Sequence, residues 1–455
     1  MRIKLGIRMS LNEIALATNG TIKRACMGAI INHISTDSRT VMQGDLYFPF
    51  KGEKYDGENY VDEAKRRGAF TASAENALCD LRVQNTVDAF LYLASYYKRL
   101  LHTLKYTVAI TGSVGKTTTK ELLADICKTS FKTHSTSGNM NNLIGMPATI
   151  LSAPENTEVL ILELGMNHPG EIKKLSECAM PDIAVITKIG TAHIGYLRTV
   201  ENIEEAKSEI IYGLCGGKLI VPEGALSSCL YRKTTFACES NTADYSVSYS
   251  KKAIQIRFKK EYENIQTSLK WQKHNLECLC CAIAAANYMN INIDRIKKQI
   301  PLFSTDIFRQ SYIKYKNIMI LDDSYNASLE SVMSAIDELC SNTNYCRHCA
   351  VLGQIFELGD NSADIHYKIG CYAAERNIHP LYLIGPDTKY IMQGAMKSGL
   401  GEHDIFFNED LSKPEITARQ ISTWCVGGDI ILFKGSHKSN LKQIIKILTE
   451  GEIYE

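Results

Sequence analysis

The sequence predicts an α/β protein of three domains: a small mixed α/β domain followed by two domains in which strands and helices alternate. A chain of 455 residues has room for several domains of roughly 100–200 residues each. Its first part contains short β-like runs separated by glycine turns. After that, apolar runs alternate with helical patterns in two successive regions, which is typical of parallel sheets with crossover helices.

The first domain is expected over residues 1–85. It contains short β-like runs such as Asp45–Phe50, and Gly44, Gly52 and Gly57 mark the turns around them. Short runs bounded by glycine indicate strands joined by tight turns. The sequence therefore predicts a small mixed domain here.

The central domain is expected over residues 86–308, where apolar runs alternate with helical patterns. The predicted strands are Thr107–Thr111, Val159–Leu164, Ile183–Thr187 and Lys218–Val221. Because continuous apolar strands separated by helices are buried on both faces, the pattern favours a parallel sheet.

The third domain is expected over residues 309–455, where the same alternation returns. Its predicted strands are Ile318–Asp322, Cys349–Gly353, Leu381–Gly385 and Asp429–Phe433. Helices are predicted after Ser328, Ser362 and Lys438. This domain is therefore also expected to be α/β.

Charge and hydropathy exclude several classes of protein. Lys and Arg number 51 and Asp and Glu 50, so the net charge is +1. No global basic field exists to recruit nucleic acid, and no nucleic-acid partner is expected. The longest apolar-leaning stretch, Cys278–Ala286, is far shorter than the roughly 20 residues that span a bilayer. No membrane insertion is expected.

The N-terminus and the cysteines indicate a cytoplasmic location. Met1–Ser10 is basic but lacks the long apolar core and cleavage site of a secretory signal. The 15 cysteines are therefore expected to be reduced thiols rather than a disulfide framework. Cys346 and Cys349 form one CxxC pair, which is weak support for zinc without a second pair.

The strongest motif is a glycine-rich loop in Thr111–Thr119, TGSVGKTTT, between an apolar run and an amphipathic helix. Strand, loop and helix in this order form a P-loop, whose amides and helix N-terminus bind phosphate. Lys116 is expected to reach the β- and γ-phosphates and Thr117 to ligate Mg²⁺. Ile110 stands where the general pattern has glycine, so the loop is a shorter variant. The alternative is a glycine turn with a surface lysine.

Three further polar residues are candidates for a metal site. Glu163 ends an apolar strand, and carboxylates at that sheet edge are placed to hold a cation. His193 follows the next strand and emerges at the same edge. Lys207 lies on an acidic helical segment. The alternatives are a satisfied charge at a strand end for Glu163, a structural histidine for His193 and a solvated helix face for Lys207.

These motifs together resemble the Mur ligases, the ATP-dependent amide ligases of peptidoglycan precursor synthesis. The resemblance rests on segments spread over all three regions: Thr111–Lys120, Gly138–Gly145, Leu162–Gly165, His168–Ile172, Gly190–His193, Ala206–Ile210, His274–Asn275 and Leu321–Ala327. Further segments point to the member that joins D-alanyl-D-alanine to a UDP-muramoyl tripeptide. They are Asp37–Arg39, Asp322–Asn326, and Val351–Gly353 with Glu357–Gly359 and His366.

The resemblance implies the following architecture and residue roles. Residues 1–85 would bind the UDP-sugar, residues 86–308 would form a P-loop-type parallel-sheet ATPase domain, and residues 309–455 would form a Rossmann-like domain for the incoming amine and part of ATP. The residues implied for the nucleotide are Gly112, Ser113, Val114, Gly115, Lys116, Thr117, Thr118, Asn275, Arg309 and Asp323. Those implied for the metal are Thr117, Glu163, His193 and a carbamylated Lys207, and Lys116, Glu163, His193 and Lys207 are the implied catalytic set. Those implied for the substrates are Asp37, Ser38, Arg39, Asn141, Asn142, Tyr325 and Asn326.

The implied reaction uses ATP and Mg²⁺ in the cytoplasm and is carried out by a monomer. ATP converts a substrate carboxylate into an acyl phosphate, which the amine then attacks to give an amide. Phosphoryl transfer needs positioning and charge neutralisation, which lysine and metal ions supply. The alternatives are a Mur-ligase-like paralog that joins another amine or acyl acceptor, and a P-loop NTPase switch or binding module.

Several positions depart from the family pattern. Lys188 stands where asparagine is common, Glu58 where histidine often occurs, and Gln272–Asn275 replaces a Gly-Arg-His-Asn run. Gln354 replaces an aspartate and His437 an arginine. The last two lie in the region implied to hold the amine, so they leave the identity of the second substrate open.

Overall fold

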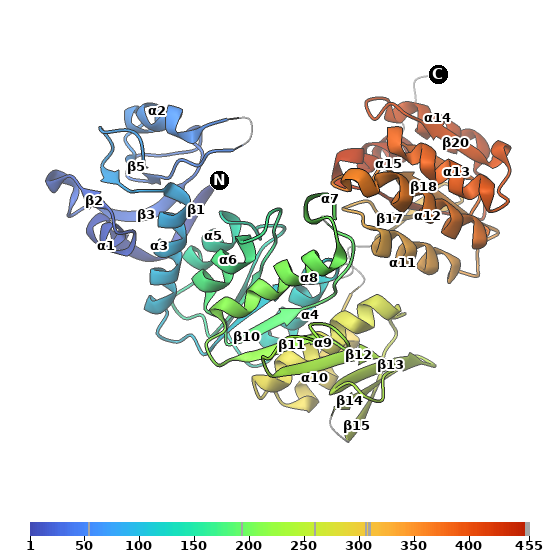
Figure 1. Ribbon diagram of the computed structural model, residues 1–455, viewed down its shortest axis with the longest axis horizontal. Coiled ribbons are helices and arrows are strands. Elements are labelled where there is room, and N and C mark those ends of the chain that lie inside the picture. The colour runs from blue at the N-terminus through green and yellow to red at the C-terminus, as the bar shows by residue number, and fades with distance from the viewer. Residues whose placement is uncertain (53–54, 193, 259–260, 305–306, 308–310, 451–455) are drawn as a thin grey trace.

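The computed structural model describes residues 1–52, 55–192, 194–258, 261–304, 307 and 311–450. Within these residues the strands form three separate sheets, of six, nine and six strands in chain order. In Figure 1 each sheet and its helices form a separate body, blue at the N-terminal end, green to yellow in the middle and orange to red at the C-terminal end. The predicted α/β class with three sheet-containing parts is confirmed.

The first sheet and its helices form the small mixed α/β part that the sequence predicted, and the sheet contains both parallel and antiparallel pairs. Its order is β1 (Arg2–Ser10), β3 (Ile30–Ser35), β4 (Leu46–Tyr47), β5 (Phe70–Ser73), β6 (Leu81–Arg82) and β2 (Thr21–Ile22). The two outer pairs are antiparallel and the inner pairs parallel. The strand expected in the run Asp45–Phe50 is only the two-residue β4. Pro49 closely follows β4 and has no N–H to extend a ladder. Two short helices belong to this part, α1 (Leu11–Ala17) and α2 (Val61–Arg66).

Helix α3 (Thr86–Leu100) connects the first sheet to the central part. Asn85 caps it by accepting the N–H of Asp88 at 2.9 Å, which satisfies an otherwise unpaired donor of the first turn. The helix packs against α1 on one side and against α5 (Gly145–Leu151) and α6 (Glu171–Ala179) on the other (Figure 1).

The central sheet positions the candidate site. Four of its strands were predicted, each to within a residue: β7 (Tyr106–Thr111), β9 (Val159–Glu163), β10 (Ile183–Ile186) and β11 (Lys218–Pro222). The full order is β15-β14-β13-β12-β11-β10-β7-β9-β8, with β8 at Thr133–Ser135, β12 at Lys233–Cys238, β13 at Tyr245–Ser250, β14 at Ala253–Phe258 and β15 at Glu261–Gln266. Pairs from β8 to β13 are parallel, whereas β13, β14 and β15 pair antiparallel.

Helices cover this sheet on both faces. They include α4 (Lys116–Lys128), α8 (Val200–Ser208), α9 (Lys273–Tyr288) and α10 (Ile293–Gln299). The short α7 (Ile194–Leu197) contacts α8 and the C-terminal residues Gly359–Asn361. Helices α4 and α9 pack against each other, and α9 contacts β11, β12 and β13. The carboxyl ends of β7, β9 and β10 therefore meet at one edge, where α4 begins.

The third sheet has the order β16 (Ser311–Tyr315), β17 (Ile318–Asp323), β21 (Asp429–Lys434), β18 (Arg347–Gly353), β19 (Leu381–Ile384) and β20 (Ile405–Asn408). Only the β16–β17 pair is antiparallel. The four predicted strands are confirmed, and β16 and β20 were missed. The helices are α11 (Leu329–Cys340), α12 (Ser362–Glu375), α13 (Lys389–Lys397), α14 (Pro414–Trp424) and α15 (Leu441–Glu450). Helix α11 follows Ser328 as predicted, because this serine forms a capping box with Ser331.

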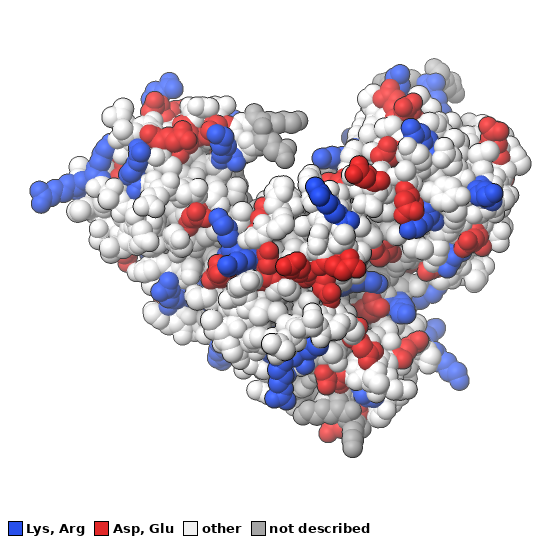
Figure 2. All heavy atoms as spheres, viewed as in Figure 1, with Lys and Arg blue, Asp and Glu red and all other residues white. Residues whose placement is uncertain are grey.

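The cysteines, the helices and the surface charges each bear on the classes of protein that the sequence excluded. All 15 cysteines are free thiols. In the part of the chain that the structure describes, no helix combines the length and the apolar character needed to cross a bilayer. The face in Figure 2 mixes Lys and Arg with Asp and Glu, and acidic side chains gather over α8, which carries Glu201, Glu204 and Glu205.

Candidate active site

The predicted P-loop lies between β7 and α4. Gly112 and Gly115 have φ values of 147° and 88°, a region that side chains rarely enter. A Cβ at Gly112 would lie 2.1 Å from Thr187 Oγ1, so only glycine fits against the neighbouring strand. Helix α4 then begins at Lys116, so the free amides of its first turn border the loop. This geometry suits a phosphate group.

Residues after the adjacent strand β10 hold the loop in place. Ser113 donates its N–H to the carbonyl of Lys188 at 2.7 Å, and its hydroxyl accepts the N–H of Gly190 at 3.1 Å. Thr187 donates its hydroxyl to the carbonyl of Val114 at 2.6 Å. The segment 187–190 therefore holds the loop at two residues, Ser113 and Val114. Lys116 lies over it, with Nζ 2.6 Å from the carbonyl oxygen of Gly112.

Glu163 faces the start of α4, as its place at the end of β9 predicted. The Thr117 hydroxyl donates to Glu163 Oε2 at 2.8 Å, and the Asn141 amide donates to Glu163 Oε1 at 2.7 Å. Glu163 is only 2% exposed. A buried carboxylate beside a hydroxyl is the kind of oxygen donor set that Mg²⁺ prefers. These residues therefore fit the cation that the sequence predicted.

Lys207 is buried rather than solvated. It lies near the end of α8 with no exposed surface, so the alternative of a solvated helix face is wrong. Among the described residues its Nζ has no hydrogen-bond partner. Burial, and then the nearby positive charge of Lys116, hold its pKa well below the usual range, while Glu209 opposes the shift. The neutral amine is thereby favoured.

The P-loop borders a cavity of about 640 Å³ that central and C-terminal residues line together. The central residues include the P-loop residues Ser113–Thr118, Asn141, Asn142 and Glu163. The C-terminal residues include Asp323, Tyr325, Asn326 and Lys434. Most of the predicted site residues that the structure describes therefore meet at one cavity, although the P-loop residues and the segment 323–326 lie more than 200 residues apart in sequence.

Polar contacts join the central and C-terminal parts at this cavity. The Glu330 carboxylate of α11 accepts two hydrogen bonds from Thr191, one from its N–H at 2.8 Å and one from its hydroxyl at 3.1 Å. The Ser334 hydroxyl lies 2.7 Å from His274 Nδ1. Burial, followed by the charges of Lys434 and Lys188, lowers the pKa of His274 to about 4. Sequence reasoning missed Glu330 and Ser334, because a contact between two domains leaves no local pattern.

Some predicted site residues are not among those that line this cavity: Gly112, Lys207, Asn275 and Asp37–Arg39. Asn275 is 2% exposed, and its Oδ1 has no hydrogen-bond partner among the residues described. Arg39 pairs with Asp37 at 2.8 Å and lowers the pKa of that carboxyl to about 2. Ser38 donates to Glu63 at 3.3 Å. His193 and Arg309, both predicted for the site, lie outside the described residues.

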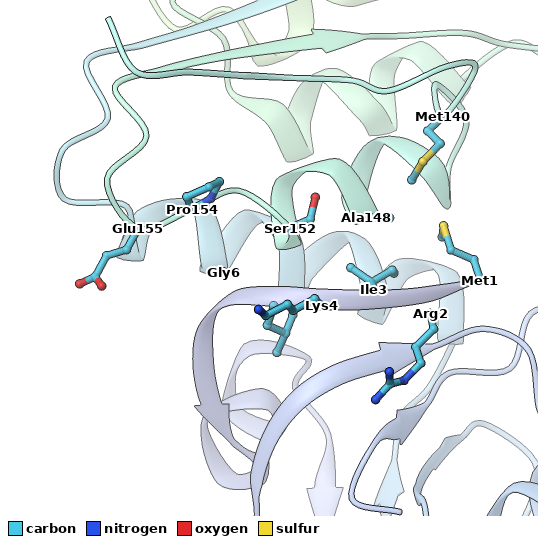
Figure 3. Close-up of a pocket in the computed structure, with 11 residues that line it drawn as sticks. Met1, Arg2, Ile3, Lys4, Gly6, Met140, Ala148, Ser152, Pro154 and Glu155 are labelled. Carbon is cyan, nitrogen blue, oxygen red and sulfur yellow. The ribbon is translucent and has the colours of Figure 1, made fainter. Parts of the chain in front are cut away.

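A second cavity, of about 570 Å³, lies between β1 and the α5 region. Figure 3 shows Met1 and Met140 at one end and Pro154 and Glu155 at the other. Arg2, which also lines it, is held by Asp45 at 2.7 Å. This cavity contains no residue predicted to bind phosphate or metal.

Comparisons with known proteins agree with this geometry. Three family profiles match in chain order: "Mur ligase family, catalytic domain" at residues 30–87, "Mur ligase middle domain" at 110–292, and "Mur ligase, glutamate ligase domain" at 309–437. A UDP-N-acetylmuramoyl-tripeptide–D-alanyl-D-alanine ligase of Bacillus subtilis is 32% identical over 98% of this chain and 100% of its own length. The enzyme of the same name from Escherichia coli is 26% identical over 98% of this chain and 99% of its own.

Solved structures resemble the whole chain as well. Crystal structure I of MurF from Acinetobacter baumannii has a TM-score of 0.86 and 26% identity, covering 98% of this chain and 100% of that one. MurF ligase from Thermotoga maritima in complex with ADP has a TM-score of 0.77 and 26% identity, over 92% and 97% of the two chains. With a full-length relative above 30% identity and profiles matching in all three parts, this chain belongs to the Mur ligase family.

Proposed function

We propose that this chain is an ATP-dependent ligase that joins D-alanyl-D-alanine to a UDP-N-acetylmuramoyl-tripeptide in the cytoplasm. The observation that carries the proposal is the shared cavity: a P-loop and a buried carboxylate on one side, and the segment 323–326 on the other. The names of the full-length relatives support the choice of substrates.

In this proposal the P-loop binds ATP and positions its γ-phosphate. The amides at the start of α4 and the ammonium of Lys116 neutralise charge that builds up as the phosphoryl group moves to the substrate carboxylate. The resulting acyl phosphate has phosphate as its leaving group, where the free carboxylate would have had to lose oxide. The amine then attacks, a tetrahedral intermediate forms, and its collapse gives the amide and inorganic phosphate.

Glu163 and Thr117 would hold Mg²⁺, with His193 as a further ligand. When bound, the cation reduces the repulsion between the polyphosphate and the substrate carboxylate. Lys207 would act as its carbamate, which converts an amine into an anion beside the metal. The burial of its Nζ and its lowered pKa support this role, because only a neutral amine adds CO₂.

The three parts of the chain would divide the remaining tasks. Residues 1–85, with Asp37, Ser38 and Arg39, would bind the UDP-sugar. Residues 86–308 would bind ATP, and Asn141 and Asn142 would contact the muramoyl peptide. Residues 309–455 would bind the amine through Tyr325 and Asn326 and complete the nucleotide site with Arg309 and Asp323. We expect the protein to act as a monomer.

A second candidate function is ligation of a different amine, and Gln354 favours it. Gln354 is 8% exposed and exchanges two 3.2 Å hydrogen bonds with Asp387, from its Nε2 to Oδ2 and from the Asp387 N–H to its Oε1. An amide thus stands where the family has a carboxylate. Activity of the purified protein with a panel of amines separates the two functions. D-alanyl-D-alanine should give the highest kcat/KM, and a higher value with another amine would favour the second.

A further inference from the structure

Lys434 ends strand β21, at the carboxyl edge of the third sheet. Strand β21 pairs parallel with β17, and the register places Lys434 directly beside Asp323. The side chain of Lys434 is only 4% exposed, and that of Asp323 is 15% exposed. A lysine this deeply buried is costly unless its charge is compensated.

Three oxygen atoms surround the ammonium group of Lys434. Its Nζ lies 3.1 Å from Asp323 Oδ2, 3.3 Å from the Asp323 carbonyl and 2.6 Å from the Asn326 carbonyl. An ammonium group has three N–H donors and no acceptor. Each donor therefore has an oxygen acceptor in the same short segment. The Lys434 side chain thus links both ends of residues 323–326 to strand β21.

The segment held in this way faces the P-loop. Asp323, Tyr325, Asn326 and Lys434 all line the cavity that also contains Lys116 and Glu163. At the start of the segment, the Asp322 carboxylate accepts the N–H and the hydroxyl of Ser324 at 3.0 and 2.6 Å. This turn orders the first residues, whereas Lys434 connects the segment to the neighbouring strand.

We propose that Lys434 is a positioning residue for nucleotide binding, acting by fixing the Asp323 carboxylate and the 323–326 segment opposite the P-loop. This inference rests on the proposed function, because it assumes that the shared cavity binds ATP. Although Lys434 lines the cavity, its Nζ is directed at oxygens of Asp323 and Asn326, so its effect on the nucleotide is exerted through that segment. Removing the ammonium group of Lys434 should therefore weaken nucleotide binding, because the Asp323 carboxylate is then no longer held in place.

The test uses the full-length chain and four variants: Lys434→Met, Lys434→Arg, Asp323→Asn and the double variant Lys434→Met/Asp323→Asn. Lys397→Met is the matched control, since Lys397 is an exposed lysine at the end of α13, in the same part of the chain. Binding of ADP with Mg²⁺ is measured by calorimetry. KM for ATP, kcat and the unfolding temperature are measured on the same preparations.

Lys434→Met should weaken ADP binding about tenfold or more and raise KM for ATP more than it lowers kcat. The double variant should bind ADP about as well as the weaker single variant, because both changes remove the same interaction. Lys434→Arg should recover part of the affinity, since it keeps the charge but not the compact three-donor geometry. Lys397→Met should match the wild type.

Two results would overturn the inference. One is ADP binding by Lys434→Met within twofold of wild type, and the other is independent, multiplying effects of the two single changes. If Lys434→Met does not fold, ADP binding by Lys434→Arg is measured instead. An affinity of Lys434→Arg within twofold of wild type would also contradict the proposal. A wild-type protein that fails to bind ADP would instead refute the proposed function itself.

Discussion

The hydroxyl of Thr117 donates a hydrogen bond to Glu163 Oε2 across 2.8 Å, linking the first turn of α4 to the end of β9. The contact exists because β7 and β9 are neighbours in the parallel sheet, with Ile110 opposite Glu163. The phosphate loop after β7 and the carboxylate that ends β9 therefore reach the same point. A hydroxyl and a carboxylate at this distance can share one cation beside the phosphate loop.

Lys116→Ala should abolish most of the ligase activity. The change removes charge stabilisation of at least ~3 kcal/mol in the transition state, which corresponds to a loss of more than about 100-fold in rate. The fold should survive, because Lys116 is the first residue of α4 and is only partly buried. Product formation is the measurement. Lys128→Ala is the control, since Lys128 is an exposed lysine of the same helix. Activity of Lys116→Ala within tenfold of wild type would remove Lys116 from the mechanism.

Glu163→Gln should raise the Mg²⁺ concentration needed for half-maximal activity. The amide keeps the shape and can still accept the Thr117 hydroxyl, but it carries no negative charge for a cation. The measurement is initial rate against Mg²⁺ concentration at saturating ATP. Glu155→Gln, a change at an exposed carboxylate, should leave the curve unchanged. An unaltered Mg²⁺ dependence in Glu163→Gln would mean that this carboxylate does not hold the cation.

Lys207→Ala should be inactive and should recover activity when formate or acetate is added. These small carboxylates can occupy the space of the lost side chain and replace the anion of a carbamate. The measurement is rate against carboxylate concentration, compared with chloride at equal ionic strength. Lys116→Ala should show no such recovery, because its missing charge is positive. Equal responses of the two variants would contradict a carbamate at Lys207.

The stability of the fold should fall as the pH drops below about 6.5, the ordinary pKa of histidine. His366 is fully buried, and its Nε2 accepts the N–H of Ile355 at 3.0 Å, so this nitrogen must be unprotonated. Burial lowers its pKa, opposed by its contacts with Ser362 and Asp387. The unfolded chain then binds more protons than the folded chain in this pH range, so acid favours unfolding.

The measurement for His366 is unfolding temperature against pH. His366→Gln cannot be protonated, and its amide oxygen can still accept an N–H, so its acid-side decline should be shallower. His403→Gln, a change at a histidine side chain that is 84% exposed, should follow the wild-type curve. Parallel curves for wild type and His366→Gln would show that His366 contributes nothing to the pH dependence.

The P-loop was predictable because its signal is local. A strand, two glycines and a helix start are consecutive in sequence, and the structure places them as β7, Gly112, Gly115 and α4. Glu163 was predictable for a related reason, since parallel strands bring their carboxyl ends to one edge. Its partners were harder to predict: Asn141 reaches it from a loop, and no spacing rule connects the two residues.

The burial of Lys207 and Lys434 could not be predicted from the sequence. Each is a lysine in a segment whose pattern allows a solvated side chain, yet each is almost fully buried. The burial of Lys207 depends on how α8 packs on the central sheet. Lys434 ends an apolar strand just as Glu163 does, and this position alone indicates a residue at the carboxyl edge of a sheet. Its partner Asp323 lies 111 residues away, on a strand that becomes its neighbour only in the folded sheet.

Strands β13, β14 and β15 were missed for a different reason. Their burial patterns alternate only partly and include exposed polar residues. Such edge hairpins lack the continuous apolar runs that identified β7, β9 and β10. Their antiparallel pairing extends the sheet away from the P-loop, so the candidate site does not depend on them.

Mass analysis of the reaction product shows directly whether this protein joins D-alanyl-D-alanine to the muramoyl tripeptide. Purified protein is incubated with ATP, Mg²⁺, a UDP-N-acetylmuramoyl-tripeptide and D-alanyl-D-alanine, and Lys116→Ala serves as the inactive control. We expect one new species, equal in mass to the two substrates minus water, with one ADP formed per amide and no turnover when either substrate is left out. ATP hydrolysis that proceeds without the two substrates, or an amide formed only with a different amine, would contradict it.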